Sequence, residues 1–338
     1  MSDKHDPIYS ERDVTPTQDP STIEAGVEAH DRSKFAMGTA VPSEEVVGIQ
    51  QEAAGRERTA SLWSDAYRQL RRKPIFIISA ILILILVVMA VFPVLFTRID
   101  PRACNLSDSL LPPSSEHWFG TDIQGCDYYA RTVYGARVSI TIGLVVTIFA
   151  TVIALIGGSV AGYYGGWTDT VIARLTDIMF VIPFILGGIV ILSLFPTRGV
   201  AQVSLVLIIL GWATMLRLVR SSVIAAKSAD YVDAARAMGG TNWRIITKHV
   251  LPNSLAPVIV YATITIGAVI SAEAALSFLG VGLQLPAISW GLMISGAQAR
   301  ILTSPNLLLF PGVFLSVTVF SFILMGDALR DALDPKLR

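Results

Sequence analysis

The chain has 338 residues, of which 53% are hydrophobic and only 15% are charged, and its mean hydropathy is +0.60. Ordinary soluble domains carry roughly 25% charged residues, so the composition excludes an ordinary soluble globular protein and indicates a membrane protein. The net charge is zero, with 26 basic and 26 acidic residues, and this balance gives no indication of nucleic-acid binding.

The first 73 residues differ in composition from the rest. They hold 13 of the 26 acidic and 10 of the 26 basic residues, four prolines and no sustained apolar period. Such a segment cannot bury enough apolar surface to offset its ordering entropy, so we expect a disordered cytoplasmic tail over residues 1–60. At least residues 1–55 of it should be dispensable for assembly. No apolar stretch of the kind that a secretory signal needs occurs there. From residue 60 to 70, the spacing of Leu62, Trp63, Ala66 and Leu70 predicts the start of a short amphipathic helix along the membrane surface.

Residues 61–338 form the predicted membrane domain. Crossing a hydrocarbon core of about 30 Å takes about 20 apolar residues, and six segments come close to this or exceed it: 75–96, 138–160, 171–195, 203–219, 255–272 and 307–325. An even number of spans places both termini on the same side. The sequence therefore predicts an all-α membrane protein with six transmembrane helices.

The basic residues indicate which side the termini occupy. Near the spans, 14 basic residues fall on the side of the termini, and six fall on the other side: Arg98, Arg102, Arg131, Arg137, Arg198 and Arg300. Basic residues are more frequent in cytoplasmic segments. Both termini are therefore predicted to be cytoplasmic, with an outer loop over residues 97–137.

Two features inside the spans have more than one interpretation. Gly158, Gly162 and Gly166 form two overlapping GxxxG steps, which either bring helices into close contact or mark a flexible helix end. Asp177 and Glu273 are the main acidic residues of the spans, and both lie near predicted span ends. We expect them to make structural pairs or caps, because an ion relay requires charged groups at midplane depth.

The motifs of the common enzyme families are missing. The sequence has no GxxxxGK[ST] phosphate loop, no HExxH, no GxSxG and no Cys/His cluster with metal-ligand spacing. We therefore expect no catalytic residue, no metal and no cofactor on this chain.

The longest cytoplasmic loop, residues 220–253, is the most informative segment. It is typical of two short helices joined by Gly239 and Gly240, with Asp230 capping the first helix and Gly239 supplying a left-handed residue at its end. One face of the first helix carries Tyr231, Ala234, Ala235 and Met238. Asp233 lies in the first turn, where a negative charge complements the helix dipole.

The second predicted helix begins at Thr241 as its cap and ends before Pro252. It carries Trp243, Ile246 and Val250. The apolar face of the first helix either docks on a partner or packs on the protein's own spans, and the spacing alone does not decide between these.

The segment DAARAMGGTNWRIITKHVLPN resembles the EAA motif of permease subunits of bacterial ABC importers. Asp233 stands in place of the usual Glu and His249 in place of the usual Ile. The resemblance implies that the loop couples the permease to a cleft of a separate ATPase subunit. The residues that match the motif, or share its helix face, are Tyr231, Asp233, Ala234, Ala235, Met238, Gly239, Leu251 and Pro252.

Three further stretches, HWFGTDIQGCDYYARTVYGARVS, AEAALSFLGVGLQLPAISWG and GDALRDALDPKLR, are similar to the C-type subunit of the oligopeptide/dipeptide/nickel permease branch. The resemblance spans roughly residues 65–338. It implies a type I ABC importer permease fold in a bacterial cell membrane, forming half of the translocation pathway of an ATP-driven peptide importer. It also implies a homologous permease subunit, two cytoplasmic ATPase subunits that bind ATP and Mg, and an extracytoplasmic substrate-binding protein.

The resemblance leaves the substrate open. Relatives in the branch carry dipeptides, longer peptides, glutathione, nickel chelates or haem. A self-sufficient secondary carrier is the alternative from a different class, and the copurification of ATPase subunits distinguishes the two.

The two cysteines, Cys104 and Cys126, both fall in the predicted outer loop, on the oxidising side of the membrane. Cys126 stands where the branch usually has Arg. We expect a disulfide between them, and the alternative is two unrelated free thiols.

Overall fold

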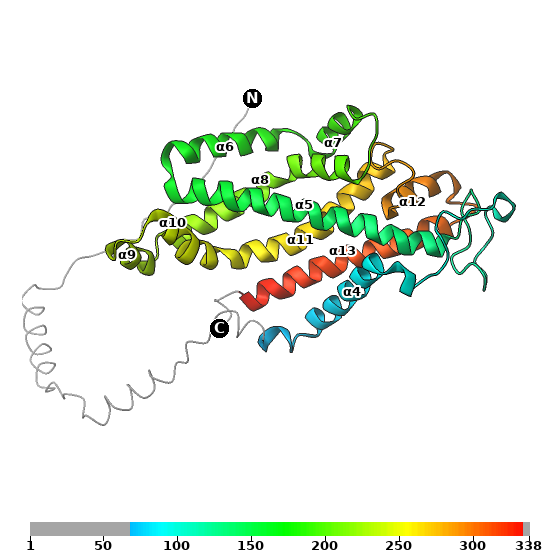
Figure 1. The fold of residues 1–338 in the computed structure, drawn as a ribbon, viewed down its shortest axis with the longest axis horizontal. Helices are drawn as coiled ribbons and strands as arrows, with labels where there is room; N and C mark the ends of the chain where they lie inside the picture. Colours follow the sequence, from blue (N-terminus) through cyan, green and yellow to red (C-terminus); the bar gives the residue numbers. More distant parts are fainter. Residues whose placement is uncertain (1–67, 334–338) are drawn as a thin grey trace, which may run out of the picture. The chain divides into compact units, whose positions relative to one another are not determined.

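The computed structural model describes residues 68–333, so the tail predicted over residues 1–60 and most of the predicted amphipathic helix lie outside it. The described residues form helices and no strands, and Figure 1 shows the long helices packed side by side. In chain order the elements are α4 (Pro74–Val91), η1 (Pro93–Leu95), η2 (Leu106–Asp108), α5 (Tyr128–Tyr164), α6 (Gly166–Val181), α7 (Phe184–Ser193), α8 (Val200–Lys227), α9 (Asp230–Ala237), α10 (Asn242–Ile245), η3 (Ile246–Val250), α11 (Leu251–Phe278), α12 (Trp290–Ala297), η4 (Gln298–Arg300) and α13 (Asn306–Leu333).

Five helices of the described chain are long and apolar enough to cross a membrane, namely α4, α5, α8, α13 and the run Asn242–Phe278 that contains α11. α6 and α7 supply the sixth candidate span, but they are bent by 85°. The span predicted over residues 171–195 is therefore broken into two helices. Pro183 explains the break, because it lacks an N–H and forces Ile182 into an extended conformation with ψ 114°.

α5 begins ten residues before the span predicted over 138–160. The Asp127 carboxylate caps it by accepting a hydrogen bond from the N–H of Ala130 at 2.7 Å. The segment between α4 and α5 consequently ends at Asp127, and the first turns of α5 fall within the predicted outer loop over residues 97–137. With 37 residues, α5 is about 55 Å long, so it extends well beyond a hydrocarbon core of about 30 Å.

Small residues bring α5 close to α8. A Cβ added at Gly158 would lie 2.8 Å from Cβ of Val219, and one at Gly162 would lie 2.9 Å from the carbonyl oxygen of Arg220. Of the two interpretations of the GxxxG steps, close helix contact therefore holds for Gly158 and Gly162. Gly166 does not take part, because it begins α6 with a φ of +56° and has no atom within 4 Å of an added Cβ.

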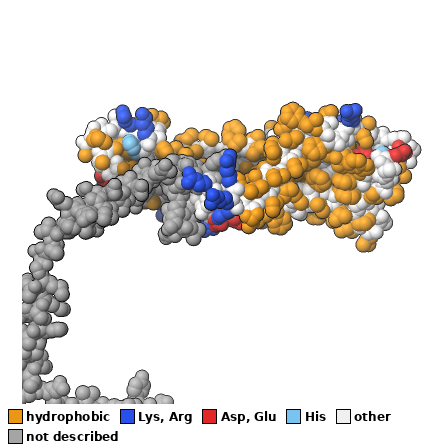
Figure 2. Space-filling view, turned by 90° about the horizontal axis from the view of Figure 1, so that it is seen from below, with side chains coloured by type: hydrophobic (Ala, Val, Ile, Leu, Met, Phe, Trp, Pro, Cys, Tyr) orange, Lys and Arg blue, Asp and Glu red, His pale blue; other side chains and the backbone are white. Residues whose placement is uncertain are grey.

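α4 leaves much of its apolar surface exposed, as the side chains of Ile78, Leu84 and Val91 illustrate. Figure 2 shows hydrophobic side chains covering a broad band of one face, with charged side chains gathered to either side of it. Such a band fits the hydrocarbon layer of a membrane.

The first and last described helices meet where the described chain begins and ends. Leu70 packs against Ala328 and Ala332, and the ammonium of Lys73 lies 3.1 Å from the carboxylate of Asp331. The start of α4 and the end of α13 therefore lie at the same end of the helices.

Candidate functional site: the α9–α10 hairpin and the cavity beside α12

The α9–α10 hairpin, residues 230–245, lies at one end of the long helices, between α8 and α11 (Figure 1). Ala229 is the N-cap residue of α9 and makes no side-chain cap, so the prediction that Asp230 caps this helix is wrong. Asp230 and Asp233 both occupy the first turn, where they complement the helix dipole. Thr241 caps α10 as predicted, with its hydroxyl accepting a hydrogen bond from the N–H of Arg244 at 3.4 Å.

The turn of the hairpin depends on Gly239. Its φ is +79°, which confirms the predicted left-handed residue, and the N–H of Gly240 then reaches the carbonyl of Ala235 at 3.0 Å. The prediction that the second helix ends before Pro252 is wrong. The chain continues through the π-helical η3 into α11, and Pro252 lies in the first turn of α11.

Packing divides the predicted apolar face of α9. Ala235 is only 5% exposed and belongs with Val232 and Ile245 to a core cluster that also includes residues of α5 and α8. Tyr231 and Met238, in contrast, are 42% and 82% exposed. Within the predicted face, Ala235 is therefore part of the protein core, whereas Tyr231 and Met238 are exposed.

The second helix adds to the exposed side. Ile246 and Val250 are buried in the core cluster, whereas Trp243 is 75% exposed. Trp243 is absent from the predicted site because sequence spacing placed it with the two buried residues. The exposed hairpin face is thus made up of Tyr231, Ala234, Met238 and Trp243.

The remaining motif residues support the hairpin. Asp233 forms an exposed ion pair with Arg236 at 3.0 Å. Leu251 packs against the core cluster, and Pro252 is exposed at the start of α11. These positions shape and join the hairpin and lie outside its exposed apolar face.

Polar contacts fix the hairpin to the end of α5. The hydroxyl of Tyr163 lies 2.9 Å from the side-chain oxygen of Asn242. The ammonium of Lys227 donates to the carbonyl of Tyr163, and the guanidinium of Arg236 lies 5.9 Å from the centre of the Tyr163 ring. A force applied to the hairpin would therefore be transmitted to the spanning helices α5 and α8.

Glu273 joins three helices deep inside the membrane domain. Its carboxylate is fully buried and accepts hydrogen bonds from the hydroxyls of Ser277 at 2.8 Å and Ser289 at 2.9 Å. The hydroxyl of Ser139 on α5 lies 3.5 Å away. Glu273 thus connects α11 to α5 and to the cap of α12. Asp177 instead pairs with Arg217 at 2.7 Å on α8.

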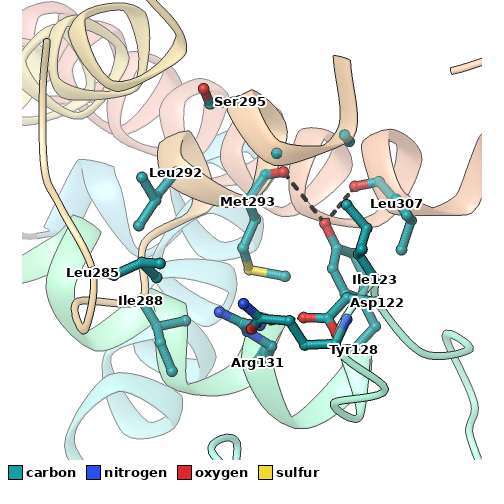
Figure 3. A pocket seen from close by; sticks show the side chains of 13 residues that line it. Asp122, Ile123, Tyr128, Arg131, Leu285, Ile288, Leu292, Met293, Ser295 and Leu307 are labelled. Atoms are coloured by element: carbon teal, nitrogen blue, oxygen red, sulfur yellow. Dashed lines mark hydrogen bonds and ion pairs between the residues drawn. The ribbon is translucent and has the colours of Figure 1, made fainter. Parts of the chain in front are cut away.

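A cavity of about 330 Å³ lies beside α12, next to the segment between α4 and α5. Figure 3 shows Arg131 and Asp122 on one side of it, facing the apolar side chains of Ile288 and Met293. Arg131 and Asp122 form an ion pair, so most of the charge in the cavity wall is compensated. The wall is consequently apolar with one neutralised polar corner.

The stretch HWFGTDIQGCDYYAR builds this corner. His117 Nδ1 lies 2.8 Å from the Asp127 carboxylate, and Asp122 accepts hydrogen bonds from the N–H groups of Gln124 and Cys126 at 2.8 and 2.9 Å. Cys104 and Cys126 form a disulfide, which confirms the predicted pairing. These roles could not be assigned from the sequence, although the motif itself marks the segment.

No group of three or more His, Cys, Asp or Glu side chains within residues 68–333 is arranged to hold a metal ion.

The sequence matches two family models. Residues 154–338 match the binding-protein-dependent transport system inner membrane component, and residues 61–113 match the N-terminal TM domain of oligopeptide transport permease C. These matches name a membrane component of a transport system, in agreement with the prediction that the chain is not an enzyme.

Curated relatives agree over most of the chain. The oligopeptide transport system permease protein OppC of Bacillus subtilis is 38% identical over 83% of this chain and 92% of its own length. The dipeptide transport system permease protein DppC of Alkalihalophilus pseudofirmus is 42% identical over 82% and 91%. The glutathione transport system permease protein GsiD of Escherichia coli is 34% identical over the same shares.

A solved structure supports the fold. A chain of the MetNI methionine ABC transporter in inward-facing conformations matches with a TM-score of 0.50 and 22% identity, over 60% of this chain and 96% of that one. The expected all-helical permease fold is confirmed. The chain therefore belongs to the binding-protein-dependent transport system inner membrane component family and is a multi-pass protein of the bacterial inner membrane.

Proposed function

We propose that the chain is a permease subunit of an ATP-driven importer of dipeptides or oligopeptides and forms half of its translocation pathway. The relatives named for oligopeptide and dipeptide transport, at 38% and 42% identity, support this substrate over glutathione, for which the named relatives are 34% identical. Nickel chelates and haem are further alternatives within the same transporter type.

The observation that carries the coupling role is the exposed hairpin face. Its large apolar side chains, Tyr231, Met238 and Trp243, are exposed on a hairpin held firmly to the spans. Apolar side chains grouped in this way mark a contact surface. We assign an ATPase subunit as the partner of this face, because the hairpin is the segment that resembles the EAA motif. ATP and Mg bind to that subunit and not to this chain.

The partners follow from the same transporter type. A homologous permease subunit completes the pathway, two ATPase subunits bind on the cytoplasmic side, and a binding protein delivers substrate from outside. Two contacts support cytoplasmic termini: Leu70 packs on the last helix, which puts both ends on one side, and the Cys104–Cys126 disulfide is typical of an oxidising compartment.

The test is transport by the chain with and without its partners. The complex is purified from native membranes, reconstituted in vesicles with the binding protein, and ATP hydrolysis is measured with dipeptides, longer peptides, glutathione, a nickel chelate and haem. The proposal predicts copurified ATPase subunits and stimulation by peptides. Uptake by the chain alone, driven by an ion gradient, would instead identify a secondary carrier.

A further inference from the structure

A basic recess of about 450 Å³ lies at the end of α4, on the far side of the membrane domain from the α9–α10 hairpin. Its polar wall is formed by Arg98, Asp100, Arg102, Tyr134 and Arg137. Three of the six basic residues on the predicted outer side of the membrane, Arg98, Arg102 and Arg137, thus lie close together. This grouping calls for a negatively charged occupant.

The charges of the recess are not balanced by the protein. Asp100 is its only acidic residue, and one of its carboxylate oxygens accepts the backbone N–H of Arg102 at 2.9 Å. Within residues 68–333, the guanidinium groups of Arg98 and Arg102 have no hydrogen-bond or ion-pair partner. Three positive charges face one negative charge, so the recess attracts anions.

The position of Arg137 sets the depth of the recess. Its guanidinium donates to the carbonyls of Ala90 at 2.9 Å and Val91 at 3.1 Å, at the end of α4. Val91 is itself exposed, as is Leu95 in η1 directly after it. The recess therefore lies where the lipid-facing surface of α4 ends, which is the level of the lipid headgroups.

We propose that this recess binds the phosphate of an anionic phospholipid. Guanidinium groups suit phosphate because their planar donors match two of its oxygens at once. The apolar part of the wall, Val138 and Ile288, lies beside the arginines and suits the glycerol and first methylenes of a lipid. The carboxylate of a transported peptide has similar chemistry, but the exposed apolar residues around the recess favour lipid.

The test measures lipid retained by the assembled transporter. The complex is washed in detergent, supplied with phosphatidylglycerol or phosphatidylcholine, and the bound lipid is quantified by native mass spectrometry. Each arginine near an anionic headgroup contributes about fivefold in affinity, so Arg98→Gln with Arg102→Gln should weaken phosphatidylglycerol binding about 30-fold. Arg300→Gln, outside the recess, should leave it unchanged.

A second variant acts in the opposite direction. Asp100→Asn raises the net charge of the recess by one and should increase phosphatidylglycerol retention, so a double arginine variant that fails to assemble does not end the test. Equal retention in the wild type and all variants would overturn the proposal. A second result would also overturn it: lipid retention is unchanged in the arginine variants, and their KM rises several-fold for free peptides but not for C-terminally amidated peptides. The recess would then bind the carboxylate of the substrate. The lipid readout needs no transport, so the proposal stands or falls independently of the transported substrate.

Discussion

Gly239 is the residue on which the conformation of the α9–α10 hairpin depends most directly. Its φ is +79°, and no atom lies within 4 Å of an added Cβ, so Gly239→Val adds backbone strain without a clash. Left-handed backbone costs an L residue about 1–2 kcal/mol. We expect hydrogen exchange of residues 230–245 to accelerate about tenfold, measured by mass spectrometry on the assembled complex.

The matched control is Gly211→Val in α8, which also has no atom near the added Cβ but has no positive φ. It should leave exchange in the hairpin at the wild-type rate. Unchanged exchange in Gly239→Val would show that the turn does not need the left-handed residue.

Ala235 and its neighbour Ala234 separate folding of the hairpin from docking. Ala235 is buried in the core cluster and Ala234 is exposed. Ala235→Arg places an unpaired charge among apolar side chains, at a cost of roughly 3 kcal/mol, and should speed exchange throughout the hairpin. Ala234→Arg should leave exchange unchanged and lower only substrate-stimulated ATP hydrolysis. Identical exchange in the two variants would contradict this division of the face.

Glu273 offers a test of the polar contact between helices. Glu273→Ala removes the acceptor for three serine hydroxyls and leaves a buried void, which should cost roughly 2–4 kcal/mol. Glu273→Gln keeps an acceptor oxygen of the same reach and should cost less than about 1 kcal/mol. Thermal unfolding of the purified complex measures both, and a loss below about 1 kcal/mol in both variants would show that the hydroxyl contacts contribute little.

At the scale of elements, the disulfide ties the segment before α5 into one unit. Cys104 and Cys126 are 22 residues apart, and closing such a loop contributes on the order of 3 kcal/mol in the chain-entropy model. The double variant Cys104→Ser/Cys126→Ser should therefore make this segment more sensitive to protease than the wild type. Mass spectrometry without reduction should detect the linked peptides. Alkylation of both thiols in native membranes would contradict the pairing.

The elements show which parts of the fold could be predicted from sequence. Long apolar runs located all six candidate spans, because crossing lipid requires them. Their ends were less predictable: α5 begins at Tyr128 after the cap Asp127, which lies in a polar stretch, and α10 runs into α11 through a π-helical turn. The break at Pro183 could have been predicted from the sequence, because a proline disfavours the helical conformation of the residue before it, here Ile182. The continuous hydropathy of the segment hid this signal.

At the scale of the whole molecule, the family could be recognised from motifs spread along the chain, and the comparisons confirm it. The segment of the candidate site was also predictable, but its exposed face was not. Helical spacing groups Ala235 with Met238, whereas packing against α5 and α8 buries the first and exposes the second. Only the tertiary contacts of the hairpin make that distinction, so spacing alone could not exclude Ala235 or include Trp243.

Binding of an ATPase subunit by the exposed hairpin face is tested most directly by Met238→Asp. Met238 is 82% exposed, so a charge there leaves the fold intact but cannot enter an apolar interface without losing water. Leu302→Asp is the matched control, because Leu302 is 94% exposed and lies beyond α12, away from the hairpin. With equal amounts of each variant in the membrane, we measure the ATPase subunit that copurifies. We expect at least about a tenfold loss for Met238→Asp, equivalent to about 1.4 kcal/mol, and wild-type recovery for Leu302→Asp. Wild-type recovery in both variants would contradict binding of the ATPase subunit by this face.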